Sequence, residues 1–224
     1  RTDALGRLLP IFCGSRRVIR ISNKKFKVFK QKTGMKPHIV SNHQGLDWNE
    51  VIKSLVTRKG RNEIIADWVA ANPKEKILIP CIRKEIQAVP LAKLLKERGE
   101  SVSLMVGNTK KYSQARILIA TMKKVACGWD DKMNCKDIFD GVRYSLIILA
   151  WSIKDPEQLV MRVFRSDTPN IVQLIDEFAS FYKHSDMRDM WYESRNSSIE
   201  WVDKPKCVKE KKKKVIVIAP KKDI

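Results

Sequence analysis

The longest apolar run of the sequence lies in its centre and constrains the core that the chain can build. Residues 146–151 are apolar throughout, and apolar side chains recur at helical spacing before them. A helix that is apolar nearly all round is buried, and this run is far below the roughly 20 residues that cross a bilayer. The pattern predicts a buried core helix over residues 136–153 and no transmembrane segment. Pro156 cannot continue such a helix.

Several neighbouring segments also favour helices. Residues 112–126 carry apolar side chains at steps of three and four, and Gly128 is a natural C-cap. The segment from Thr168 to Tyr182 shows similar spacing, and further helices are expected over residues 47–59, 63–71, 90–98 and 187–194. The predicted fold class is therefore α+β and predominantly α-helical: a helical core with a small basic β-hairpin and a C-terminal strand or arm.

The β elements are expected mainly near the two ends. Arg17–Ser22 and Lys25–Lys30 are rich in β-branched or aromatic residues and predict a basic hairpin. Val215–Ala219 is a strong strand former that could pair with this hairpin or with a neighbouring molecule. Residues 76–82 favour a strand or an extended connection, and Pro80 predicts an edge position. The expected organisation is a basic arm with a hairpin over 1–36, a helical core domain over 37–202 and a Lys-rich tail with a short strand over 203–224.

Positive charge is concentrated at the same two ends. The chain has 45 Lys and Arg against 25 acids, a formal net charge of +20. Residues 1–36 hold 11 Lys or Arg and one acid, and residues 203–224 hold nine and three. A nearly neutral body with cationic ends is typical of a protein that binds a polyanion. Nucleic acid, RNA in particular, is favoured over an anionic membrane surface because the ends lack a long amphipathic helix.

The sequence therefore predicts a nucleic-acid-binding structural protein of a nucleoprotein, capsid or ribonucleoprotein assembly. It would not be an enzyme, and it would associate with itself or with other protein subunits. Phosphates would be contacted without reading base sequence. The side chains expected to make these contacts are Arg16, Arg17, Arg20, Lys24, Lys25, Lys27, Lys30, Lys211, Lys212, Lys213 and Lys214. Most central aromatics are interpreted as core. Those that adjoin cations, and could stack on bases, are Tyr182, Trp191 and Tyr192.

One stretch offers an enzymatic alternative. Residues 39–47 (I-V-S-N-H-Q-G-L-D) resemble the first motif of glycerolipid acyltransferases, in which Asn-His is followed by four residues and then Asp. In that family the His acts as base and the Asp orients it, which would make His43 and Asp47 catalytic, although only three residues separate them. The later stretch 103–110 is similar to the family's phosphate-binding motif but lacks its Glu. A third alternative is a protein–protein adaptor that docks by its C-terminal strand.

Other chemistry has little support in the sequence. The five cysteines have no metal-ligand spacing, which predicts no metal site and free thiols in a reducing compartment such as the cytoplasm, the nucleus or an organelle matrix. Asp67 with Asp130-Asp131-Lys132 is a weak match to the carboxylates of a metal-dependent nuclease. The chain has neither a P-loop nor a dinucleotide fingerprint, so no cofactor is expected.

Overall fold

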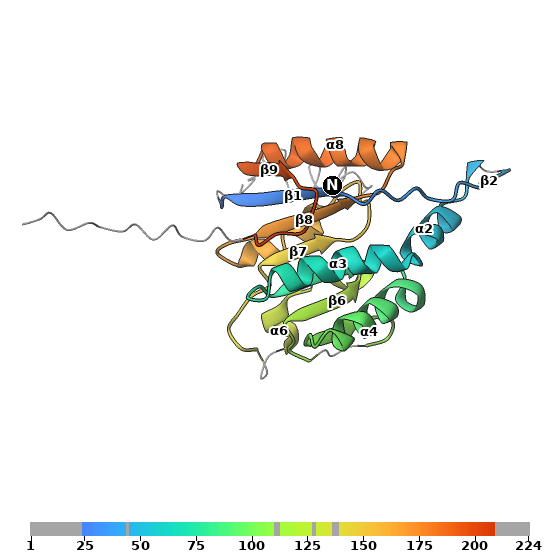
Figure 1. The fold of residues 1–224 in the computed structure, drawn as a ribbon. Helices are drawn as coiled ribbons and strands as arrows, with labels where there is room; N and C mark the ends of the chain where they lie inside the picture. Colours follow the sequence, from blue (N-terminus) through green and yellow to red (C-terminus); the bar gives the residue numbers. More distant parts are fainter. Residues whose placement is uncertain (1–23, 44, 110–112, 127–128, 136–138, 209–224) are drawn as a thin grey trace, which may run out of the picture.

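The structure is a computed structural model that describes residues 24–43, 45–109, 113–126, 129–135 and 139–208. Its centre is one sheet in which all recorded strand pairings are parallel. The strand order is β5-β6-β4-β7-β8-β1-β9 (Figure 1). The strands are β1 (Phe26–Lys32), β4 (Ile77–Cys81), β5 (Val102–Met105), β6 (Ile117–Thr121), β7 (Leu146–Leu149), β8 (Asn170–Ile175) and β9 (Ser197–Trp201). β2 (Ser41–Asn42) and β3 (Gly45–Leu46) form a small antiparallel pair apart from this sheet.

The predicted predominantly helical α+β class is wrong, because the chain is an α/β protein built on a parallel sheet. The three segments expected to supply the core helices contain β6, β7 and β8 instead. All four residues of β7 and all six of β8 are buried. Parallel strands covered on both faces are continuously apolar, and a short apolar run cannot be assigned to helix or strand from its spacing alone.

The helices cover both faces of the sheet. Ile65 and Trp68 of α3 (Lys59–Ala71) pack with Leu91 of α4 (Val89–Glu97) on one face. The other face is covered by α5 (Met122–Val125), α6 (Asp131–Cys135), α7 (Glu157–Val160), the 3₁₀ turn η3 (Val163–Arg165) and α8 (Ala179–Glu193). Val125 and Tyr192 belong to that second core. This two-sided cover explains why the central strands carry no polar face.

The remaining helices lie near the ends of the strands. In α2 (Trp48–Val56) the first turn is capped by Asp47, as the sequence predicts. The π-helical turn η1 (Lys84–Ala88) connects β4 with α4. After α4 the chain turns at Gly99 with φ +82°, so the helix ends near residue 98, where the sequence predicts its end. No helix in the described part of the chain is long and apolar enough to span a membrane.

Two predicted β features differ from the structure. Residues 26–30 of the predicted strand Lys25–Lys30 belong to β1, which lies between β8 and β9 and runs parallel to both, so it is not half of a hairpin. Arg17–Ser22 and Val215–Ala219 lie outside the described residues. The segment with Pro80 is not an edge strand, since β4 lies between β6 and β7. The recorded pairing of β4 with β7 ends at Leu78, so the missing N–H of Pro80 breaks none of those pairs.

The strands all end on the side of the sheet that carries α2 and the β2–β3 pair (Figure 1). At this carboxyl edge β4 continues into η1 and α4 on one face, while β6 continues into α5 on the other. Ligands of open α/β sheets bind where neighbouring strands diverge in this way. A third apolar cluster, which includes Val51, Leu55, Trp151 and Phe181, packs α2 against this edge.

Candidate nucleic-acid interface and arginine cluster

The cations predicted to bind phosphate do not share one environment. Lys30 is buried and forms an ion pair with Asp189 at 2.5 Å, because β1 is an inner strand. Lys24 donates to the carbonyl oxygens of Phe164 and Ser166 at 3.1 and 2.7 Å. Lys25 is exposed, and with Lys27 it lines a pocket of about 540 Å³ where β1, β8 and β9 begin. The other seven lie outside the described residues: Arg16, Arg17, Arg20 and Lys211 to Lys214.

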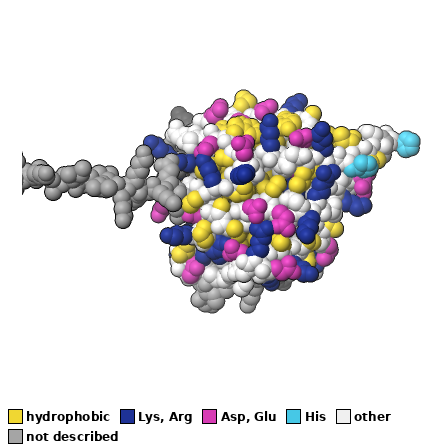
Figure 2. Space-filling view, viewed as in Figure 1, with side chains coloured by type: hydrophobic (Ala, Val, Ile, Leu, Met, Phe, Trp, Pro, Cys, Tyr) yellow, Lys and Arg dark blue, Asp and Glu magenta, His cyan; other side chains and the backbone are white. Residues whose placement is uncertain are grey.

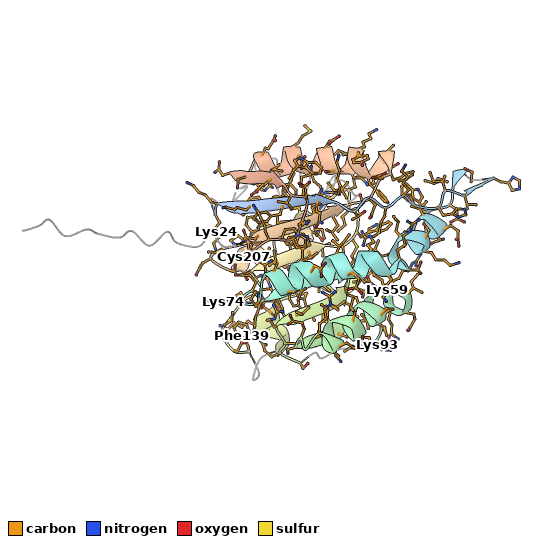
Figure 3. The ribbon with its side chains drawn as sticks, viewed as in Figure 1. Lys24, Lys59, Lys74, Lys93, Phe139 and Cys207 are labelled. Carbon is orange, nitrogen blue, oxygen red and sulfur yellow. The ribbon has the colours of Figure 1, made fainter. Side chains whose placement is uncertain are left out.

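The face of the molecule shown in Figure 2 does not form one basic surface. Figure 2 shows Lys and Arg side chains interspersed with Asp and Glu over the face that carries α3 and α4. Lys24, Lys74 and Cys207 lie at the end of the sheet where β1 begins, whereas Lys59 and Lys93 lie toward the opposite end (Figure 3). The charge of the described body is therefore distributed, and a site has to be sought in local clusters.

The residues of the predicted stacking surface are largely covered. Tyr192 is fully buried, and burial raises the pKa of its phenol. Trp191 is half-buried, with the guanidinium of Arg195 4.2 Å from its ring centroid. Tyr182 is also half-buried. Tyr192 cannot stack on a base from this position.

His43 and Asp47 are not arranged as a catalytic pair. The Asp47 carboxylate accepts hydrogen bonds from the backbone N–H groups of Asn49 and Glu50 at 2.9 and 3.3 Å, so it caps α2. His43 is exposed at the turn between β2 and β3. In Figure 2 the histidine side chains project from the tip of the molecule. The residues of the nuclease-like match also lie apart. Asp67 pairs with Arg98 at 2.7 Å on one face of the sheet, whereas Asp130 lies on the other face. Within the described ranges no group of acids, His and Cys could hold a metal ion.

A row of cations follows the carboxyl ends of β4 and β6, and we call it the basic rim: Arg83, Lys84, Lys123 and Lys124. Arg83 is exposed and donates to Asn49 Oδ1. The stem of Lys84 lies against Gly107, beyond β5, where an added Cβ would lie 3.7 Å from its Cδ. Lys124 Nζ donates to the carbonyl of Thr109 at 3.3 Å. These contacts spread the rim over the ends of three adjacent strands.

The basic rim is poorly neutralised by acids. Lys84 pairs with Glu85 at 2.8 Å, but in the described part of the chain no ion pair is recorded for Arg83, Lys123 or Lys124. Positive charge without acidic partners, placed where open α/β sheets bind ligands, is suited to an extended polyanion.

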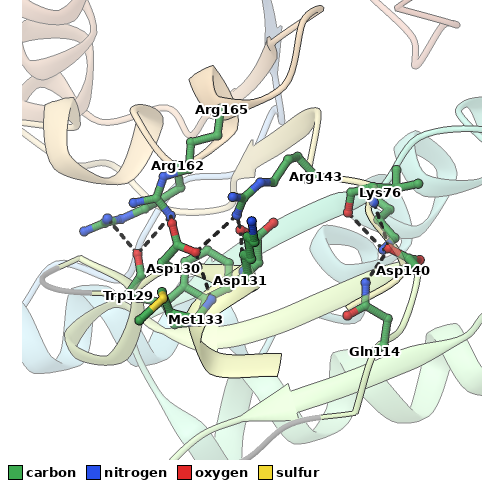
Figure 4. A network of polar contacts seen from close by, with 12 residues as sticks. Lys76, Gln114, Trp129, Asp130, Asp131, Met133, Asp140, Arg143, Arg162 and Arg165 are labelled. Carbon is green, nitrogen blue, oxygen red and sulfur yellow. Dashed lines mark hydrogen bonds and ion pairs between the residues drawn. The ribbon is translucent and has the colours of Figure 1, made fainter. Parts of the chain in front are cut away.

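A second cluster lies on the face covered by α5 to α8, and we call it the arginine cluster: Arg143, Arg162, Arg165, Asp130 and Asp131 (Figure 4). Arg165 binds Asp130 at 2.6 Å and also donates to the carbonyl of Trp129. Arg143 contacts both aspartates. Arg162 donates to three carbonyl oxygens, those of Val125, Ala126 and Trp129, at 2.9, 2.6 and 2.7 Å.

In the arginine cluster the guanidinium groups of Arg143 and Arg165 bind the two carboxylates. Burial opposes ionisation of Asp130, but the N–H of Met133 and the guanidinium groups of Arg165 and Arg143 outweigh it and hold the pKa of this carboxyl below its ordinary value. Asp131 is buried, while Arg165 keeps 30% of its side chain exposed. The cluster is thus a charged surface site, and the partly exposed Arg165 can contact a further anion such as a phosphate.

A separate polar network in the same view is structural. Lys76, largely buried at the start of β4, binds both carboxylate oxygens of Asp140 at 2.6 Å. Gln114 donates to the same carboxylate at 2.7 Å (Figure 4). These contacts attach the loop before β7 to β4 and leave no free charge for a ligand.

The fold is an α/β fold of the kind seen in the C-terminal domain of the DEAD-box protein Dbp5. The chain superposes on the C-terminal domain of the DEAD-box protein Dbp5 with a TM-score of 0.52 and 13% identity, covering 81% of this chain and 91% of that domain. It also superposes on S. cerevisiae Dbp5 bound to RNA and ADP BeF3 with a TM-score of 0.56 and 13% identity, over 91% of this chain and 49% of that one. It superposes on S. cerevisiae Dbp5 L327V bound to Gle1 H337R and IP6 with a TM-score of 0.52 and 14% identity, over 91% of this chain and 48% of that one.

Among curated proteins, the chain is similar to a putative helicase, 161L, of Invertebrate iridescent virus 6. The two are 25% identical over 225 residues, which span 89% of this chain. The chain covers 48% of that protein, about half its length. No protein-family model matches the chain.

These likenesses overturn two predictions made from charge. The prediction of a structural protein of a capsid or nucleoprotein is wrong, because the chain has the fold of a DEAD-box protein domain and is similar to a putative helicase. The prediction that the chain is not an enzyme is wrong on the same findings. The helicase-like relative also displaces the acyltransferase alternative, for which the exposed His43 and the capping Asp47 offer no site.

The basic rim and the arginine cluster were not predicted from the sequence, because the prediction rested on the net charge of long segments. Residues 37–202 hold 25 Lys or Arg and 21 acids, so this body looked nearly neutral. The usable signal was local: Arg83-Lys84 and Lys123-Lys124 each follow closely after an apolar segment. Once those segments are strands of one parallel sheet, their cations must meet at one edge.

Proposed function

We propose that this chain is a RecA-like domain of a nucleic-acid-dependent ATPase of the helicase type. It would bind nucleic acid across the basic rim and present the arginine cluster to a nucleotide held chiefly by another domain. The observation that carries the proposal is the arginine cluster on a domain with this fold: Arg143 and Arg165 bind the carboxylates of Asp130 and Asp131, and Arg162 lies beside them, bonded to backbone carbonyls.

The arginine cluster fits the phosphates of a nucleotide only in part. Guanidinium groups suit phosphate oxygens because they offer paired, charge-assisted hydrogen bonds. The sequence has no glycine-rich P-loop, so this chain lacks the backbone cradle that holds a nucleotide. ATP bound by a second domain would supply the phosphoryl group that is hydrolysed. The role left to this chain is that of an arginine finger, which stabilises charge in the transition state.

Arg165 and Arg162 would have different parts in this arrangement. Arg165 is partly exposed and bound to Asp130, so it can exchange a carboxylate for a phosphate without leaving a buried charge unpaired. Arg162 donates hydrogen bonds to three carbonyl groups, and these bonds connect the end of α5 with the start of η3. We assign phosphate contact to Arg165 and positioning of the cluster to Arg162.

Nucleic acid is the partner that the basic rim would bind, and RNA is favoured. Dbp5 has been solved with RNA and ADP BeF3, which supports both ligands for a domain of this fold. The structure of Dbp5 with Gle1 supports a further protein partner. The free Cys81 and Cys207 support a reducing compartment as the site of action.

The test is ATP hydrolysis by the full-length natural protein, with and without single-stranded RNA. Arg165→Ala should lower kcat by about 10³-fold, the lower range for loss of an arginine finger. Arg165→Lys should restore little, because an ammonium group cannot make the paired contact. The matched control is Arg98→Ala, which removes an arginine bound to Glu63 and Asp67 on α3 and should leave kcat within about twofold.

Each outcome is decisive for the proposal. Loss of hydrolysis in Arg165→Ala, with unchanged thermal unfolding, supports it. If Arg165→Ala hydrolyses ATP at the wild-type rate, Arg165 is not an arginine finger. If the natural protein hydrolyses no ATP, the proposed ATPase activity is wrong.

A further inference from the structure

Trp48 is held at the carboxyl edge as an exposed aromatic ring. It is the first residue of α2, and the adjacent Asp47 cap fixes the start of that helix. Its ring lies 6.0 Å from Phe178 at an interplanar angle of 75° and 6.3 Å from Phe181 at 35°. The side chain is nevertheless 43% exposed, whereas Trp68 and Trp151 are buried. Two aromatic neighbours therefore fix the indole while part of it faces solvent.

A cation of the basic rim lies near Trp48. The next residue, Asn49, accepts a hydrogen bond from Arg83. Phe181, whose ring is a neighbour of Trp48, lies in the first turn of α8, two residues before the exposed Lys183.

Several acids near this site are bound to cations: Glu50 binds Lys53, Glu85 binds Lys84 and Glu177 binds Lys36, at 3.2, 2.8 and 3.7 Å. The carboxylate of Asp47 accepts hydrogen bonds from the first turn of α2. In the described residues no acid partner is recorded for Arg83, which donates to Asn49 beside Trp48. An exposed aromatic ring beside cations is the arrangement that single-stranded nucleic acids use for stacking.

We propose that Trp48 stacks on an unpaired base of a single-stranded nucleic acid whose phosphates lie along the basic rim. This inference rests on the proposed function and specifies its substrate as a single strand. A base inside a duplex has both faces covered by its neighbours, so the indole can reach only a base that is unstacked. Trp48 would thus favour the separated strand over the duplex at the edge where the rim holds the backbone.

Trp201 provides a matched control. It is 52% exposed, but the ammonium groups of Lys30 and Lys32 lie 4.4 and 5.7 Å from its ring centroid. It belongs to the edge strand β9 and is far from the rim in the strand order. An exposed tryptophan at the opposite edge of the sheet from the rim should not contribute to stacking on a strand bound there.

The experiment compares two fluorescently labelled strands of about 12 nucleotides, one of thymidines and one in which abasic sugars replace the central nucleotides. Both carry the same phosphates, so their difference in affinity reports bases alone. The wild-type chain should bind the thymidine strand roughly tenfold tighter. Trp48→Ala should bind both strands alike and keep the wild-type salt dependence, because phosphate contacts remain. Trp48→Phe should keep part of the preference, and Trp201→Ala all of it.

The outcomes separate this inference from the proposed function. If Trp48→Ala unfolds like the wild type and still prefers the thymidine strand, stacking by Trp48 is wrong while binding at the rim stands. If the wild type binds neither strand at low salt, nucleic-acid binding itself is wrong. Equal binding of both strands by the wild type also rejects the stacking.

Discussion

The residues with most influence on the stability of the sheet are polar and buried. Arg61 of α3 binds both carboxylate oxygens of Asp176, which follows β8, at 3.1 and 2.9 Å. Each side chain is 1% exposed. Thr33, which follows β1, donates to the same carboxylate at 2.7 Å. One buried carboxylate thereby joins a helix to the ends of two adjacent strands.

Removing that carboxylate should be costly. Asp176→Asn leaves the Arg61 guanidinium buried without its counter-charge, and we expect the free energy of unfolding to fall by about 3–5 kcal/mol. Urea denaturation measures it. The control Lys53→Gln breaks an exposed pair with Glu50 and should cost less than about 1 kcal/mol. A loss below about 1 kcal/mol in Asp176→Asn would show that the pair is not needed for stability.

His184 should make stability depend on pH. Its pKa is lowered in the fold, first by burial and then by Arg188, Lys154 and Lys183, from an ordinary value of 6.5. Just below that pH the unfolded chain binds more protons than the native one, so stability should fall as the pH drops through about 6.5 until the folded group also titrates. Urea midpoints between pH 5 and 8 measure the slope. His184→Gln should flatten it, and an unchanged slope would contradict this origin.

At the scale of elements, helices with local signals and the strand segments of β1 and β4 could be predicted, but the buried strands β6, β7 and β8 could not. Asp47 before α2 and Gly99 after α4 mark helix ends that the structure confirms. β7 and β8 have no polar face, so nothing in their own residues separates a buried strand from a buried helix. β9 was missed because its partner β1 lies about 170 residues earlier in the chain.

The candidate sites could be predicted only in part. The sequence shows which cations are present, but the order of the strands in the sheet decides which of them lie together. Asp130 and Arg165 are 35 residues apart and meet because the chain crosses between β6, β7 and β8 on one face. Lys30 shows the converse, since a lysine in a basic segment became buried when β1 took an inner position.

The division of labour inside the arginine cluster gives a prediction at this scale. Arg162→Met leaves the carbonyl groups of Val125, Ala126 and Trp129 without that donor, so the free energy of unfolding should fall by about 1–3 kcal/mol. Arg165→Ala should cost clearly less stability, because its main partner Asp130 is accessible to water. Chemical denaturation of the two variants side by side checks the order. The reverse order would contradict the assigned roles.

For the whole molecule, the charge pattern has to be interpreted together with the fold. The ends still hold most of the excess charge, and phosphate contacts by Arg16, Arg17, Arg20 and Lys211 to Lys214 stay a prediction. The sheet adds a fixed row of cations at its carboxyl edge. If the chain acts as a helicase-type domain, this rim, and not net charge in general, should govern the affinity for a single strand.

The most direct test of that claim is the salt dependence of binding to single-stranded RNA by two variants of equal net charge. One replaces the rim, Arg83, Lys84, Lys123 and Lys124, by alanine. The other replaces Lys59, Lys74, Lys93 and Lys96, which lie outside it. Each phosphate contact on a single strand contributes about 0.7 to the slope of log affinity against log salt. The rim variant should lose about 3 from the slope and the second variant little. Equal losses in the two variants would contradict the account.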